Sequence, residues 1–192
     1  MLPPRAAVPS GRDVLEIDWA FFGELCRALA FRIAGAFDPE LVLGIAKAGV
    51  IPGVVVASIL QRDFASMGVT RPTAGVRPTL VTAPPPSVKG RRVLIVDETC
   101  DTGDTLKLAL SAVRRVGPAE VRTAVSFKTG PYSPDFYALE TGSKIILPWD
   151  REVLVRGEFV MRPEYAAWLS ESGSGAPSSL KRSTPTRNPV PR

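Results

Sequence analysis

The most informative absences in this 192-residue chain are those of histidine and of clustered cysteines. Because the chain has no histidine, acid–base chemistry that depends on an imidazole is excluded. Its two cysteines, Cys26 and Cys100, have neither zinc-site nor disulfide-framework spacing, which favours a reducing compartment. No apolar run reaches the ~18 residues of a membrane span, and no signal-peptide core follows the first basic residue. We therefore expect a soluble cytoplasmic protein with no membrane partner.

Length and composition suit one globular domain, since 45% of the residues are hydrophobic. We expect an N-terminal extension over residues 1–14, one domain over residues 15–170, and a disordered basic tail over residues 171–192. The Ser/Pro-rich composition of that tail cannot bury enough apolar surface to offset its ordering entropy. The tail also carries much of the net charge of +5. Because no aromatic residues are interleaved with these charges, we do not expect specific nucleic-acid binding.

The stretch that says most about function is residues 93–106, VLIVDETCDTGDTL. Its first four residues form an apolar run typical of a strand buried in a parallel sheet, and such sheets carry their functional loops at the carboxyl ends of the strands. Asp97 and Glu98 end the run, and a loop rich in hydroxyl groups follows. The apolar spacing over residues 104–116 then predicts a helix. A small-residue loop before a helix N-terminus indicates a phosphate site.

A second strand–loop–helix pattern lies nearer the N-terminus. Residues 41–46 are apolar and lead into Lys47, Ala48 and Gly49, after which Pro52 can help to begin a helix. A loop with a glycine and a cation suits diphosphate, because its backbone N–H groups can approach the oxygens closely. Taken alone, the loop is also compatible with an ordinary strand-to-helix turn.

Two further segments bear on the site. Residues 63–90 are rich in Pro, Gly, Thr and Arg, and a long connection of this kind is usually a lid or a disordered segment. Two sets of side chains alternate along residues 120–127, which predicts a strand that ends with Lys128 at the same edge of the sheet. An ammonium there suits a carbonyl oxygen of a ligand, although lysines at strand ends are as often solvated surface residues.

Residues 97–105 resemble the phosphoribosyl-diphosphate (PRPP) signature of type I phosphoribosyltransferases, in which two acidic residues precede Asp-Thr-Gly-x-Thr. The resemblance implies that the acidic pair faces the ribose hydroxyls and that the turn wraps the 5′-phosphate. It also implies that Asp101 lies near N7 of a purine base as a general acid/base. Residues 44–53 resemble the family's diphosphate loop, with Lys47 in place of arginine, and imply an unusual peptide geometry at Ala46-Lys47.

Later motifs resemble those of 6-oxopurine enzymes. The sequence Phe127-Lys128-Thr129 matches the context of a lysine that contacts O6 of the purine. Residues 145–150 resemble the Pro-Trp-Asp run near the base pocket, and Arg156 matches a diphosphate-binding arginine six residues beyond the aspartate. One departure is that Lys144 or Ile145 stands where the family has a base-stacking ring. Trp149 can substitute for that ring, although a tryptophan in an apolar run is more often a core residue.

The resemblance implies three groups of site residues. The PRPP-binding group is Ala46, Lys47, Ala48, Gly49, Asp97, Glu98, Asp101, Thr102, Gly103, Asp104, Thr105 and Arg156; the base-binding group is Lys128, Ile145, Ile146 and Trp149; and the metal-binding group is Asp97, Glu98 and Asp150.

The resemblance covers about residues 15–165 and implies an α/β protein with the type I phosphoribosyltransferase fold. This fold has a central parallel sheet, helices on both faces and a flexible hood loop, here over about residues 63–90. The implied reaction is Mg²⁺-dependent transfer of the 5-phosphoribosyl group from PRPP to a 6-oxopurine base, with release of diphosphate, by a homodimer.

Two alternatives stay open. One is a regulatory protein of the same fold that binds PRPP or a nucleotide without turnover. The other is a transferase for another base, such as orotate or adenine. Retention of Lys47, Asp101 and Lys128 argues against the first, and Lys128 with Pro148-Trp149-Asp150 favours a 6-oxopurine over the second.

Overall fold

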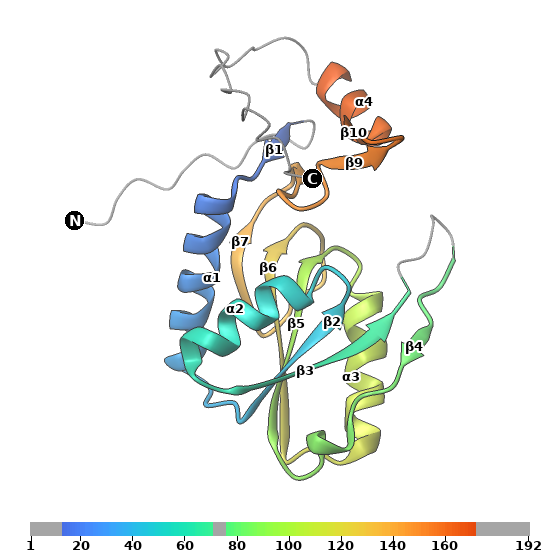
Figure 1. Ribbon diagram of the computed structural model, residues 1–192. Helices are drawn as coiled ribbons and strands as arrows, with labels where there is room; N and C mark the ends of the chain where they lie inside the picture. The colour runs from blue at the N-terminus through green and yellow to red at the C-terminus, as the bar shows by residue number, and fades with distance from the viewer. Residues whose placement is uncertain (1–12, 71–75, 172–192) are drawn as a thin grey trace, which may run out of the picture.

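The computed structural model describes residues 13–70 and 76–171 of the chain. Its centre is a six-stranded sheet with helices on both faces (Figure 1). The strands are β2 (Leu41–Ala46), β3 (Asp63–Val69), β4 (Leu80–Thr82), β5 (Arg92–Cys100), β6 (Glu120–Lys128) and β7 (Phe136–Glu140). Their spatial order is β4-β3-β2-β5-β6-β7, and every neighbouring pair is parallel except β3 with β4. The predicted α/β fold is therefore confirmed.

Three helices cover the sheet: α1 (Trp19–Ala34), α2 (Val50–Leu60) and α3 (Asp104–Val116). Helices α1 and α2 pack on one face and α3 on the other (Figure 1). The helix α1 begins at Asp18, whose carboxylate accepts a hydrogen bond from the backbone N–H of Phe21 at 2.7 Å. The apolar run of β5 is buried on both faces, and each such side chain contributes roughly 1.5–3 kcal/mol. This burial holds the end of β5 in a fixed place.

The connections of the sheet place a crevice between β2 and β5. From β2 the chain continues to β3 on one side, and from β5 it continues to β6 on the other. Loops that leave two adjacent strands in opposite directions open a crevice at the carboxyl edge of the sheet. The loops after β2 and β5, which the sequence singles out, therefore meet at that edge.

The expected loop over residues 63–90 is wrong in extent, because its first part is β3 and residues 80–82 are β4. Ala65, Met67 and Val69 alternate along β3 and pack on the core under α3. Asp63 and Gly68, which are uncommon inside strands, obscure this two-residue period in the sequence. Of the connection itself, residues 71–75 lie outside the described residues, as do residues 1–12 of the expected extension and residues 172–192 of the expected tail.

Smaller elements lie beyond the carboxyl ends of the sheet strands (Figure 1). Strands β1 (Val14–Glu16) and β8 (Lys144–Ile146) form a parallel pair, strands β9 (Glu152–Val155) and β10 (Glu158–Met161) form a hairpin, and α4 (Pro163–Glu171) follows. The connections between β8 and β9 and between β10 and α4 form the wall opposite the edge of the sheet. Among the described helices, none has the length and apolar character needed to cross a bilayer.

Candidate functional site

A cavity of about 760 Å³ lies at the carboxyl edge of the sheet. Its lining comes from residues 46–48 after β2, residues 101–103 after β5, the first turn of α3, and Val69 and Thr70 at the end of β3. Trp149, Asp150 and Arg162 line it from the opposite wall. The crevice expected from the sheet topology is therefore a real cavity, and it holds most of the residues that the sequence singles out.

The acidic pair at the end of β5 forms the base of the cavity. Asp97 is 6% exposed and Glu98 is 1% exposed, because both lie within β5, whose side chains are buried on both faces. The Asp97 carboxylate accepts a hydrogen bond from the backbone N–H of Glu98 at 2.9 Å. Gly49 packs directly against Asp97, since a Cβ at Gly49 would lie 2.7 Å from the Asp97 Oδ1 atom. The loop after β2 is thus seated on the acidic pair, and only glycine fits that contact.

The loop after β2 contains a cis peptide bond between Ala46 and Lys47, which confirms the unusual geometry expected there. Ala46, Lys47 and Ala48 line the cavity, and the Lys47 side chain is exposed. A cation at this position can offset negative charge on a ligand.

The loop after β5 leads into α3 through a left-handed glycine. Gly103 has φ of 76°, and α3 begins at the next residue. The Lys107 ammonium donates to the Thr102 carbonyl at 2.9 Å and to the Asp104 carboxylate at 3.2 Å. The hydrogen bond from Lys107, and next that from Thr102, hold the pKa of the Asp104 carboxyl below its usual value. Because residues 102–105 line the cavity at a helix N-terminus, their backbone N–H groups suit a phosphate.

Asp101 lies between the acidic pair and the phosphate-binding loop. It lines the cavity, and Gly130 packs against it so closely that a Cβ at Gly130 would lie 2.0 Å from the Asp101 Oδ1 atom. The neighbouring Cys100 is buried, and burial first, then the charges of Asp97 and Asp101, raise the pKa of its thiol to about 11. A thiol that stays protonated at neutral pH is a poor nucleophile and a poor proton acceptor. Of these two neighbours, the Asp101 carboxylate is therefore the better candidate for proton transfer.

The opposite wall holds the one aromatic ring among the described residues that line the cavity, Trp149. This ring packs on Phe22 at 4.8 Å and on Trp19 at 5.8 Å, measured between ring centres. Asp150 accepts a hydrogen bond from the Tyr165 hydroxyl at 2.9 Å, and its carbonyl accepts one from the Arg162 Nε atom at 2.6 Å. Burial first, and then this hydrogen bond, raise the pKa of Tyr165. The helix α4 therefore holds Asp150 at the cavity.

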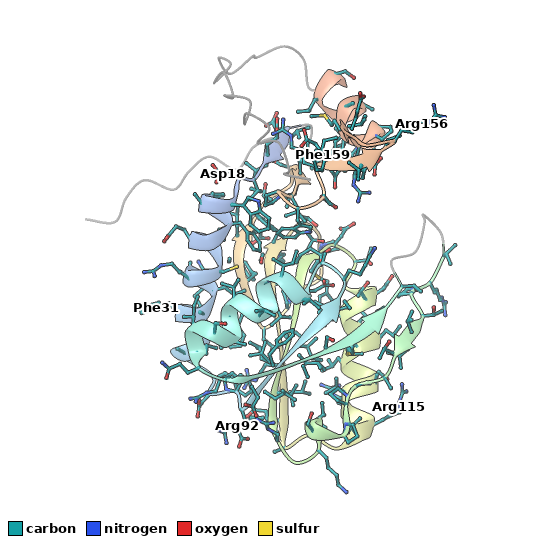
Figure 2. All side chains as sticks on the ribbon, viewed as in Figure 1. Asp18, Phe31, Arg92, Arg115, Arg156 and Phe159 are labelled. Atoms are coloured by element: carbon teal, nitrogen blue, oxygen red, sulfur yellow. The ribbon has the colours of Figure 1, made fainter. Side chains whose placement is uncertain are left out.

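Arg156 does not reach the cavity. It occupies the turn of the β9–β10 hairpin with φ of 50°, is exposed, and points away from the sheet (Figure 2). The six-residue spacing from Asp150 is misleading, because the hairpin carries Arg156 outward and returns the chain at Arg162. Arg162 lines the cavity instead. No sequence signal distinguishes Arg162 from Arg156 or Arg151.

Lys128 is also outside the cavity lining. Its ammonium is bound to the Glu140 carboxylate, and it lies 5.6 Å from the centre of the Tyr137 ring. The hydrogen bond between the Lys128 ammonium and the Glu140 carboxylate raises the pKa of Lys128 and lowers that of Glu140. Lys128 is nevertheless the register neighbour of Cys100, which does line the cavity. The amine is therefore close to the site but engaged elsewhere.

Ile145 and Ile146 do not line the cavity either. Both belong to β8, which pairs with β1, and the Ile146 carbonyl accepts a hydrogen bond from the backbone N–H of Ile17 at 2.9 Å. The sequence predicts that the backbone groups of Ile145 and Ile146 face the base. It gives no sign of β1, because the three residues of that strand show no strand pattern. Because β8 pairs with β1, backbone groups of β8 are hydrogen-bonded to that strand instead of facing the ligand.

The cavity suits a magnesium ion in its donor chemistry. Among the described residues that line it, the carboxylates are Asp97, Glu98, Asp101, Asp104 and Asp150, and the cations are Lys47 and Arg162. Carboxylate oxygens are the protein ligands that Mg²⁺ prefers, and Mg²⁺ usually keeps waters and substrate oxygens as well. Within residues 13–70 and 76–171, no three His, Cys, Asp or Glu side chains converge on one point as a metal cage. Asp97, Glu98 and Asp150 thus offer carboxylate oxygens to a Mg²⁺ ion at the cavity without forming a preorganised cage, so the ligand would have to supply further oxygens.

Comparisons with known proteins agree with this arrangement. Residues 18–154 match the family model described as the phosphoribosyl transferase domain. The crystal structure of a purine phosphoribosyltransferase from Pyrococcus horikoshii OT3 is similar, with 26% identity and a TM-score of 0.66 over 75% of this chain and 99% of that one.

Two curated relatives match shorter stretches. An adenine phosphoribosyltransferase of Mycobacterium avium is 31% identical over 103 residues, which cover 52% of each chain. The human hypoxanthine-guanine phosphoribosyltransferase is 32% identical over 92 residues, which cover 45% of this chain and 41% of that one. The chain therefore spans about half the length, or less, of these two relatives.

Proposed function

Because this chain belongs to the phosphoribosyltransferase family, we propose that it transfers the 5-phosphoribosyl group of PRPP to a 6-oxopurine base and releases diphosphate, with Mg²⁺ as its cofactor. The observation that carries the proposal is the meeting of two loops at one cavity. The cationic loop after β2 packs on Asp97 through Gly49, and the phosphate-binding loop begins at Thr102, four residues beyond Glu98.

The charges of the cavity support this chemistry. Cleavage of the bond between ribose C1 and diphosphate develops positive charge on the sugar and negative charge on the leaving group. Asp97 and Glu98 stabilise the first charge through their carboxylates, and Lys47 and Arg162 stabilise the second. Bound Mg²⁺ supplies further positive charge at the diphosphate. Opposite charges on the two sides of the breaking bond lower the barrier to cleavage.

Asp101 is the proposed general acid/base at N7 of the purine. Asp101 lines the cavity next to the phosphate-binding loop, which supports a position near the base when the 5′-phosphate occupies that loop. Since the chain has no histidine and Cys100 stays protonated, a carboxylate is the appropriate proton carrier here. Gly130 packs directly against the Asp101 carboxylate, and because glycine has no Cβ it leaves room for that carboxylate in its observed position.

The choice of a 6-oxopurine depends on Lys128. To reach O6, this lysine must turn away from Glu140 or share its ammonium with it. Trp149 offers the aromatic surface against which a base can pack. Adenine is the second candidate, because the mycobacterial relative carries the name of an adenine enzyme and Lys128 is engaged with Glu140 in the structure.

A panel of bases tests the proposal. The protein is incubated with PRPP and Mg²⁺ together with hypoxanthine, guanine, xanthine, adenine, orotate or uracil, one base at a time, and diphosphate release is measured. We expect release with the 6-oxopurines and none with orotate or uracil. Diphosphate release with adenine and with no other base would show that the substrate is adenine and not a 6-oxopurine. PRPP binding without release for any base would instead support the regulatory alternative.

A further inference from the structure

The segment that follows β6 folds back against the loop that follows β5. The backbone N–H of Thr129 donates to the Cys100 carbonyl at 2.8 Å, and that of Tyr132 donates to the Asp101 carbonyl at 3.4 Å. The ring of Tyr132 lies directly on Gly103, since a Cβ at Gly103 would be 2.2 Å from the Tyr132 Cγ atom. The ring therefore covers the bend of the phosphate-binding loop.

Lys107 connects the same ring to the same loop from α3. Its ammonium lies 5.2 Å from the centre of the Tyr132 ring and donates to the Thr102 carbonyl at 2.9 Å. A cation over an aromatic face is attracted by the electrons of the ring. Tyr132, Lys107 and residues 102–103 thus form one packed unit.

The two sides of this loop have different surroundings. Residues 102–105 line the cavity, whereas Tyr132 does not. Gly103 is buried under the ring and has φ of 76°, a conformation that glycine adopts freely but does not hold by itself. A loop with this freedom loses conformational entropy when it closes on a phosphate, unless neighbouring groups already hold it in the bound shape.

We infer that Tyr132 is a positioning residue for the phosphate-binding loop, acting through ring contact with Gly103 and Lys107 rather than by touching the ligand. The inference rests on the proposed function, which assigns the 5′-phosphate of PRPP to residues 102–105. The contacts of Tyr132 described above involve its ring and its backbone, so the ring is the part of the side chain that matters. Phenylalanine should therefore substitute for tyrosine, and alanine should not.

The test measures binding of PRPP with Mg²⁺, in the absence of any base, by isothermal titration calorimetry. Tyr132→Ala should weaken binding by about 10-fold, and Tyr132→Phe, the matched control that retains the ring, should stay within about twofold of the unsubstituted protein. In steady-state assays, Tyr132→Ala should raise the KM for PRPP while the KM for the base stays unchanged. A residue that only stabilised the fold would not produce this split.

Several outcomes would overturn the inference. Tyr132→Ala that binds PRPP as tightly as the unsubstituted protein would do so, as would Tyr132→Phe that is as weak as Tyr132→Ala. If Tyr132→Ala fails to fold, as judged by circular dichroism, Tyr132→Leu takes its place. Failure of both to fold would assign the ring to stability alone and would also overturn the inference.

The measurement is separable from the proposed function, because PRPP binding needs no base and no turnover. Binding by the unsubstituted protein without nucleotide formation would remove the proposed activity and leave the role of Tyr132 to be decided by the variants. Absence of PRPP binding by the unsubstituted protein would overturn both.

Discussion

At the scale of single residues, the site depends on close contacts that tolerate no added atom. Gly49 against Asp97 and Gly130 against Asp101 each leave less than 3 Å for a Cβ. Both glycines come from loops that are distant in sequence from the carboxylates they support. The carboxylates of the cavity are therefore positioned by tertiary packing as well as by the strand that carries them.

Asp101→Asn should lower kcat with a purine substrate by about 10²-fold or more, because an amide cannot take up or release the N7 proton. The shape of the side chain is retained, so PRPP binding should change little. Steady-state kinetics with PRPP in excess checks this. Asp63→Asn is the matched control, because this exposed carboxylate lies at the start of β3, away from the cavity, and its loss should leave kcat unchanged. Unchanged turnover in Asp101→Asn would remove the acid/base role.

The two arginines after Asp150 should differ in their effect on PRPP. Arg162→Ala should raise the KM for PRPP by roughly 10-fold or more, because a charged hydrogen-bonding partner in the cavity is lost. Arg156→Ala, at the exposed hairpin turn, should leave this KM unchanged. Initial rates at varied PRPP concentration give the KM of each variant. A larger increase in Arg156→Ala than in Arg162→Ala would instead support Arg156, which the spacing in the sequence predicts.

At the scale of elements, the ends of β6 and β7 bear on the proposed choice of base. The register sets Lys128 opposite Glu140, and the two side chains form an ion pair at the edge of the sheet. If a 6-oxopurine binds as proposed, the Glu140 carboxylate would compete with O6 of the base for the Lys128 ammonium. We therefore expect the preference for a base to depend on both strand ends rather than on one lysine.

Lys128→Ala should lower kcat/KM for hypoxanthine by about 10-fold or more and should affect adenine much less, because only the 6-oxopurine has a carbonyl for the ammonium. Glu140→Gln keeps the size of the partner but removes its charge, so the 6-oxopurine reaction should be retained or improved. Parallel assays with the two bases provide the measurement. An equal loss for both bases in Lys128→Ala would contradict contact with O6.

The elements also explain how much of the site could be predicted from the sequence. The loops after β2 and β5 are contiguous segments, so their strand–loop–helix patterns locate them at the cavity, and the resemblance to the family's diphosphate loop predicts the unusual peptide bond at Ala46-Lys47. Arg162 and Tyr132 reach the site only because a hairpin and a strand crossover bring them there. The sequence predicts a loop where β3 lies, because Asp63 and Gly68 interrupt the apolar pattern of that strand. Contiguous phosphate loops are thus visible in the sequence, whereas on the opposite wall the sequence singles out Trp149 and Asp150 but not Arg162.

At the scale of the whole molecule, the buried thiol of Cys26 couples the stability of the fold to pH. Cys26 is fully buried in the core between α1 and the sheet, and burial raises the pKa of its thiol from 9.0 to about 12. The folded protein therefore keeps a proton that the unfolded chain releases above pH 9. Stability from this group is complete below pH 9 and is lost as pH rises toward 12.

The free energy of unfolding should accordingly fall by about 1.4 kcal/mol per pH unit from this thiol alone once pH exceeds 9. Urea unfolding between pH 8 and pH 10.5 measures the slope. Cys26→Ala should show a shallower decline, because it has no thiol to ionise. The comparison concerns slopes, so the cost of the smaller side chain in the core does not affect it. Parallel slopes for the two proteins would contradict the assignment.

The central claim is that the cavity joins the phosphoribosyl group of PRPP to a purine. Its most direct test is a single incubation with PRPP, Mg²⁺ and an equimolar mixture of hypoxanthine, adenine and orotate, followed by identification of the nucleotide product by mass. We predict that the ribonucleoside 5′-monophosphate of hypoxanthine predominates and that diphosphate forms in equal amount. The absence of any nucleotide from a folded protein that binds PRPP would contradict the claim.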